Sequence, residues 1–180
     1  MIPRTICLHG PESTGKSTLA PRLAALFGGV VVDEYGREYA EAHGIDFTMD
    51  DLVAIAVEHD RRARALLAAG ADPLILDTDP LMTAVWADML FGRRDSWFDS
   101  WTGTADLYLL LDIDLPWIED GTRLFGSVEE RRRFFDFSRA ELDRRGVRWA
   151  LVSGHGEARF EAAVAAIEAA GAGKIPNVRE

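Results

Sequence analysis

Two features common in proteins are nearly absent from this chain, and each absence narrows its interpretation. Cys7 is the single cysteine among 180 residues, so an intrachain disulfide is excluded and nothing indicates an oxidising compartment. No run of apolar residues is long enough to cross a bilayer, and no basic leader with a signal core precedes the first strand pattern. We therefore expect a cytoplasmic protein with no membrane partner.

Acidic residues outnumber basic ones, with 30 Asp and Glu against 20 Lys and Arg. The formal net charge is −10 and the isoelectric point is near 4.9, so the surface would repel a nucleic-acid backbone and we expect no nucleic-acid partner. Lysine occurs only as Lys16 and Lys174, and every other basic residue is an arginine in an alanine-rich background. Arginine runs are therefore weak evidence for function, whereas Lys16 stands out.

The length and composition suit one α/β domain with a proper core, because 48% of the 180 residues are hydrophobic. We expect this domain to span residues 1–172 and to be followed by a flexible tail, residues 173–180. Neither the sequence nor its composition indicates an oligomeric state.

Short apolar runs alternate with stretches of helical periodicity along the chain. The predicted strands are Thr5–His9, Val30–Val32, Leu74–Leu76, Leu107–Leu111 and Trp149–Val152. Helices are predicted from Lys16 to Phe27, Asp50 to Gly70, Leu81 to Phe91, Val128 to Arg145, and from about Glu157. Residues 33–38 and the segment containing Trp97 and Trp101 are predicted to be polar or loop regions. Five strands alternating with helices predict a parallel sheet covered on both faces.

The strongest motif joins the first strand to the first helix. Residues 10–17, Gly-Pro-Glu-Ser-Thr-Gly-Lys-Ser, match G-x-x-x-x-G-K-[ST], the phosphate-binding P-loop. Its glycines let the backbone approach phosphate oxygens, and the amides at the helix start attract an anion. The predicted phosphate-binding residues are Gly10, Ser13, Thr14, Gly15, Lys16, Ser17 and Thr18.

A magnesium ion is expected beside the nucleotide. The Ser17 hydroxyl should ligate the metal, and Asp77, at the end of the third strand, is the candidate carboxylate of a Walker B element. An ordinary capping aspartate is the alternative interpretation of Asp77. The cofactors predicted from these residues are ATP and Mg²⁺, and the absence of a guanine-reading Asn-Lys-x-Asp stretch favours ATP over GTP.

Further carboxylates follow the predicted strands, at the edge of a parallel sheet where ligands bind. Glu34 is our choice for the group that accepts or orients a hydroxyl proton near the γ-phosphate, with Asp33 as the alternative. For either residue, the alternative interpretation is a loop carboxylate that is exposed to solvent and has no functional role. Asp79 falls at the same edge.

Arginines gather between the fourth and fifth strands, where small kinases often carry a closing lid. We expect a lid over about residues 119–145, in which Arg123, and secondly Arg131, would neutralise charge on the transferred phosphate. Most of the arginines in this region are expected to be a solvated helix face.

Several stretches together make the chain resemble the ribosylnicotinamide kinase domain of NadR-type proteins. They are residues 9–18, Glu34-Tyr35-Gly36-Arg37-Glu38-Tyr39, Ile55-Ala56 with His59, Asp77-Thr78-Asp79, and Pro116-Trp117 followed by Asp120-Gly121 and Arg123. The resemblance covers nearly the whole chain. It implies a three-layer P-loop NTPase or nucleoside-kinase-like fold with a five-stranded parallel sheet and a helical lid, and ATP-dependent phosphorylation of nicotinamide riboside to nicotinamide mononucleotide.

Nicotinamide riboside carries a cationic pyridinium ring, which favours a pocket of carboxylates and aromatic faces. The residues expected to contact such a substrate are Asp33, Glu34, Tyr35, Arg37, Asp79, Trp86, Trp117 and Asp120. For any single tryptophan, core packing is the alternative. Two other functions stay open at this point: a kinase for another small nucleoside or metabolite, and an ATP-binding regulatory switch with slow ATPase activity.

Overall fold

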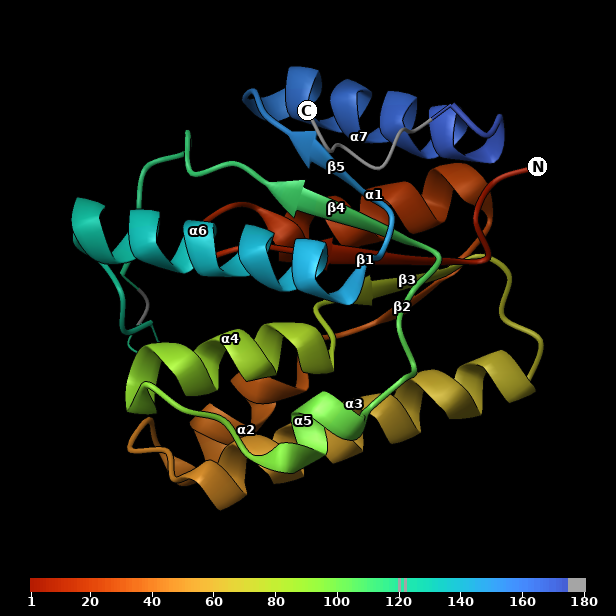
Figure 1. Ribbon diagram of the computed structural model, residues 1–180. Coiled ribbons are helices and arrows are strands. Elements are labelled where there is room, and N and C mark those ends of the chain that lie inside the picture. Colours follow the sequence, from red (N-terminus) through yellow and green to blue (C-terminus); the bar gives the residue numbers. More distant parts are fainter. Residues whose placement is uncertain (120, 122, 175–180) are drawn as a thin grey trace.

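A five-stranded sheet forms the centre of the computed structural model, which describes residues 1–119, 121 and 123–174. All strand pairs are parallel, in the order β2-β3-β1-β4-β5 (Figure 1). The strands are β1 (Thr5–His9), β2 (Val30–Val32), β3 (Leu74–Asp77), β4 (Leu107–Leu111) and β5 (Trp149–Val152). The sequence prediction of five parallel strands is confirmed, with bounds correct to one residue.

Helices cover both faces of the sheet, as parallel crossovers require. One face carries α1 (Lys16–Phe27) and α7 (Gly156–Gly171), and the other carries α3 (Met49–Ala68), α4 (Pro80–Phe91) and α6 (Val128–Arg145). Two shorter helices lie on the same side of the sheet as α3 and α4: α2 (Tyr35–His43) contacts α3, and α5 (Ser96–Ser100) contacts α4 (Figure 1). The three-layer α/β fold is thus confirmed.

Successive side chains of β1 enter opposite halves of the core. Ile6 and Leu8 pack in the cluster beneath α1 and α7, whereas Cys7 packs in the cluster beneath α6, where Leu142 also lies. β4 alternates in the same way, and every residue of it is buried. Burial on both faces explains why these strands read as continuous apolar runs.

The helices α2 and α5 were not predicted, because both are short, at nine and five residues. Ala40 is the one buried residue of α2. α5 is a single short turn that begins where the Asp95 carboxylate accepts from the Trp97 N–H at 2.8 Å, and it buries Phe98. α5 is thus defined by its cap and by local packing, which periodicity does not detect.

The C-terminal part of the expected lid is anchored to the body of the protein. In α6, Phe134 packs with Met82 and Val85 of α4, and Phe135 joins the cluster beneath the sheet. The lid over residues 119–145 therefore stays a prediction, and α6, which makes up most of that range, packs against α4 and the sheet. Across the described residues, no helix combines the length and apolarity needed to span a membrane.

Candidate phosphate and acceptor site

The P-loop leaves β1 and ends on the first turn of α1. Gly10 has φ 127°, and a Cβ there would lie 2.9 Å from the Leu111 carbonyl oxygen, so a side chain is excluded. Gly15 caps α1 at φ 86°, and the buried Thr14 hydroxyl donates to the Pro11 carbonyl at 2.8 Å. This backbone forms a fixed cradle at a helix N-terminus, which favours anions.

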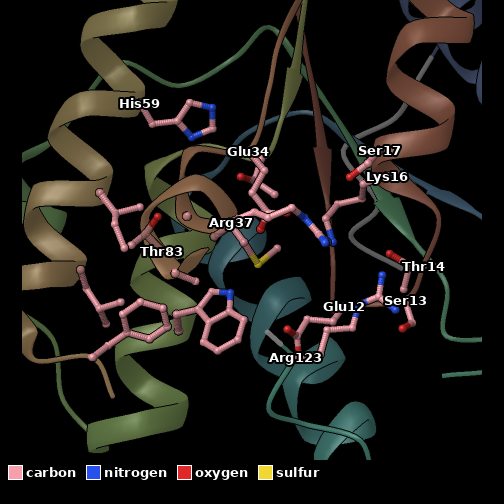
Figure 2. A pocket seen from close by; sticks show the side chains of 18 of the residues that line it. Glu12, Ser13, Thr14, Lys16, Ser17, Glu34, Arg37, His59, Thr83 and Arg123 are labelled. Atoms are coloured by element: carbon pink, nitrogen blue, oxygen red, sulfur yellow. The ribbon is translucent and has the colours of Figure 1, made fainter. Parts of the chain in front are cut away.

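Three cationic side chains face the cradle. The buried Lys16 ammonium donates to the carbonyls of Gly10 at 2.9 Å and Pro11 at 2.7 Å, so it is held against the loop itself. Figure 2 shows the Arg37 guanidinium directed toward Lys16, and that of Arg123 directed toward the neighbouring part of the loop. Such a cluster matches the charge of a polyphosphate.

A buried arginine from the other end of the chain supports the loop. Arg159 in α7 donates to the Thr14 carbonyl at 3.1 Å and the Gly154 carbonyl at 2.8 Å, and it pairs with Asp114. Sequence reasoning missed Arg159, because 145 residues separate it from Thr14 and arginine is the ordinary base of this chain.

The segment after β4 is fastened to the P-loop. The Ile118 N–H donates to the Ser13 hydroxyl at 3.1 Å, and the Leu124 N–H donates to the Glu12 carboxylate at 3.1 Å. Arg123, between them, donates to the Ile118 carbonyl and lines the cavity. Burial raises the pKa of Glu12, while the amides it accepts from lower it. The sequence did not indicate this role for Glu12.

The residues expected to hold magnesium fit a hard cation. Asp77 is buried at the end of β3, and its Oδ1 has no hydrogen-bond partner among the described residues. Burial raises the pKa of Asp77, against the opposing effects of the Lys16 charge and the Ser17 hydroxyl. The unpartnered Asp77 Oδ1 and the neighbouring Ser17 hydroxyl are oxygen donors of the kind that Mg²⁺ prefers.

A cavity of about 440 Å³ joins the cradle to a second, largely apolar compartment, and this volume suits a small-molecule ligand. The P-loop half is lined by residues 12–18 and Arg123, and the other half by Glu34, Gly36, Arg37, Ala40, Phe47, Leu52, Ile55, His59, Thr78, Met82, Thr83 and Trp86. The second compartment is therefore built from α2, α3, α4 and the segments beside them.

Glu34 is common to both halves. It follows β2 as the residue before α2, and it lines the cavity, where Figure 2 shows it between Lys16 and His59. Burial raises the pKa of Glu34 to about 6, against the opposing charges of Lys16 and Arg37. A carboxylate with this pKa can take up a proton near neutral pH.

Other residues proposed from the sequence to bind substrate do not line this cavity. Asp33 is exposed, and the Arg62 guanidinium stacks on the Tyr35 ring at 4.3 Å from its centroid. Asp79 caps α4 by accepting from the Leu81 N–H at 2.9 Å, and it also accepts from the Tyr108 hydroxyl. Burial raises the pKa of Asp79 to about 6.

Trp117 and Arg131 do not line the cavity either. The Trp117 ring lies against Gly126, and Arg131 donates to the Leu115 carbonyl at 2.8 Å from within α6. Asp120 lies outside the described residues. The roles predicted for Asp33, Tyr35, Asp79, Trp117, Arg131 and Asp120 stay predictions, whereas the structure brings together Lys16, Ser17, Glu34, Arg37, Trp86 and Arg123 around one cavity.

The fold and the loop cradle define a P-loop domain of the kind that holds nucleotide phosphates. A family model described as an AAA domain matches residues 5–159, and the chain belongs to that family. The match extends from β1 to Arg159, the residue that supports the P-loop from α7.

Among curated proteins, the chain is similar to the trifunctional NAD biosynthesis/regulator protein NadR of Escherichia coli strain K12 and of Salmonella typhimurium. Each is 31% identical over 137 residues, which is 73% of this chain and 33% of the relative. The chain thus spans about a third of the length of these relatives. The resemblance to NadR noted in the sequence is confirmed.

Solved structures share the fold. A NadR protein in complex with NR has a TM-score of 0.78 at 24% identity, covering 99% of this chain and 54% of that one. Deoxyadenosine kinase from M. mycoides has a TM-score of 0.64 at 12% identity, covering 92% of this chain and 99% of that one. The chain therefore shares its fold with NadR and with deoxyadenosine kinase.

Proposed function

We propose that this protein is a ribosylnicotinamide kinase, which transfers the γ-phosphate of ATP to the 5′-hydroxyl of nicotinamide riboside and forms nicotinamide mononucleotide. The observation that carries the proposal is the position of Glu34 in one cavity, between the P-loop and an aromatic-lined compartment. The similarity to NadR proteins supports the choice of acceptor.

The phosphate half of the cavity would hold ATP. Lys16 would exchange its two loop carbonyls for β- and γ-phosphate oxygens, and Arg123 would offset charge on the transferred group. Ser17 and Asp77 would hold Mg²⁺, which neutralises phosphate charge and orients the γ-phosphate.

The acceptor half would place the ribose hydroxyl beside Glu34. The 5′-oxygen attacks the γ-phosphorus, the hydroxyl proton passes to the Glu34 carboxylate, and the bond to the β,γ-bridging oxygen breaks, so that ADP leaves with the electron pair. The Trp86 ring, which lines this half, would offer an aromatic face to the cationic pyridinium.

The first experiment is a coupled assay of ADP release with Mg²⁺ and ATP, with and without nicotinamide riboside, and with product identification by mass spectrometry. We expect strong stimulation and the mass of nicotinamide mononucleotide. A panel of other nucleosides forms the comparison, since nucleoside and nucleotide kinases share the fold. Stimulation by another nucleoside alone would reassign the acceptor, and ATP turnover that no acceptor stimulates would contradict the kinase.

A further inference from the structure

His59 is a buried polar residue in the wall of the acceptor compartment. It lies one turn after Ile55 and two turns after Leu52 on the buried face of α3, and only 2% of its surface is exposed. It lines the cavity, and Figure 2 shows its imidazole extending from α3 toward the side of Glu34.

The imidazole has an unused hydrogen-bonding atom. Its Nε2 is buried and has no hydrogen-bond partner among the described residues. Leaving a buried polar atom without a partner destabilises the fold, and an apolar side chain on this face of α3 would avoid that cost. A ligand in the cavity would supply the missing partner.

The environment of His59 also keeps the ring uncharged. Burial, with a smaller effect from the Arg62 charge, lowers the pKa of His59 to about 4, and Asp60 opposes this shift. A neutral imidazole offers one donor and one acceptor nitrogen. Unlike an imidazolium, it does not repel a cationic base in the same compartment.

We propose that His59 Nε2 forms a hydrogen bond with a neutral polar group of the phosphoryl acceptor and thereby contributes to acceptor binding. This inference rests on the proposed function in taking the apolar half of the cavity as the acceptor site. Nicotinamide riboside offers two neutral groups with the required chemistry, the carboxamide of the base and the hydroxyls of the ribose.

The test compares His59→Leu and His59→Gln with the wild-type protein, on the acceptor that the wild type uses best. We expect His59→Leu to raise the KM of the acceptor about tenfold, since one hydrogen bond is lost, and to leave the KM of ATP within twofold. Its Tm should equal or exceed that of the wild type, because an unsatisfied polar atom is removed. His59→Gln, which keeps a polar group near Nε2, should stay within about threefold.

Exposed His43 provides the matched control, and His43→Gln should leave both KM values unchanged. A purely structural role for His59 would appear as a lower Tm in His59→Leu with the acceptor KM unchanged, and that result would overturn the proposal.

Substrate analogues identify the group that His59 contacts. For each analogue we compare the acceptor KM of His59→Leu with that of the wild type. This KM ratio should fall to nearly one on pyridine riboside if the partner is the carboxamide, or on a deoxyribose analogue if the partner is a hydroxyl. A KM ratio that stays at about ten on every analogue would contradict a direct hydrogen bond.

A binding measurement on the wild-type protein separates this inference from the kinase assignment. In ¹⁵N spectra of histidine-labelled protein without ATP, the His59 Nε2 resonance should shift when nicotinamide riboside, or the best nucleoside of the panel, is added. A shift without ATP turnover would support the contact and contradict the kinase. Turnover without a shift would support the kinase and overturn the contact, and neither effect with any nucleoside would overturn both.

Discussion

The two halves of the cavity are built on different principles. Apart from Arg123, the phosphate half is lined by seven consecutive residues, 12–18, of a loop whose backbone conformation creates the binding surface. The acceptor half is formed by side chains from α2, α3 and α4, which span more than fifty positions of the sequence. Backbone recognition suits a ligand part common to all nucleotides, whereas side-chain recognition can be changed one residue at a time, so under the proposed function we expect substrate specificity to depend on the second half.

The largest effect should come from the phosphate half. Lys16→Ala removes the charge expected at the β- and γ-phosphates, and we expect turnover of any acceptor to fall about a thousandfold. The chain offers a matched control, because Lys174→Ala removes the only other lysine, at an exposed position near the end of α7. Steady-state rates of the two variants, with circular dichroism as the folding check, would sharpen the comparison. Similar losses of turnover in both variants would contradict the role of Lys16 in the phosphate half.

An intermediate effect should come from the residue shared by both halves. Glu34→Gln removes the proton acceptor, and we expect kcat to fall about a hundredfold or more. Because the pKa of Glu34 is about 6, the wild-type kcat/KM should fall below pH 6 as the carboxylate is protonated. The variant should lose this acidic limb. Rates measured from pH 5 to 8 test both effects.

Asp33→Asn is the control for Glu34, because Asp33 is adjacent, acidic and exposed. It should keep the wild-type rate and pH profile. An acidic limb that disappears in Asp33→Asn and persists in Glu34→Gln would assign the base to Asp33 instead.

The smallest of the three effects should come from the acceptor half. Trp86→Leu removes the aromatic face while keeping an apolar side chain, and we expect the KM of the acceptor to rise about tenfold, with the KM of ATP within twofold. Trp149→Phe, on the edge strand β5, is the control. If Trp86→Leu changed the KM of ATP as much as that of the acceptor, the two halves would not be separable.

The same contrast explains what the sequence could predict. The strands, the long helices and the P-loop were predictable because each depends on local periodicity or on consecutive residues. Glu34, Arg37 and Arg123 were chosen from their place at strand ends or in a family motif, and they do line the cavity. These features require no knowledge of tertiary contacts.

The remainder depended on contacts between distant residues. Phe47, Met82 and Thr83 meet in one wall only because α3 and α4 pack together, and nothing in their local sequence indicates it. Asp79 was expected to bind substrate because it follows a strand, yet its carboxylate is engaged by the first turn of α4 and by Tyr108, 29 residues away. A strand-end carboxylate can serve either a ligand or a helix cap, and the sequence does not distinguish these uses.

The contact between Arg159 and the Thr14 carbonyl has a consequence for how the protein is made. On the ribosome, Gly10–Thr18 would emerge first, but this carbonyl would gain its guanidinium only after β5 and the start of α7 had also emerged. A nascent chain ending before α7 would contain the complete P-loop motif but would lack the Arg159 contact with the Thr14 carbonyl. We therefore expect nucleotide binding to appear late in synthesis, so that a protein truncated before residue 156 would carry the signature of an ATP site and bind ATP poorly.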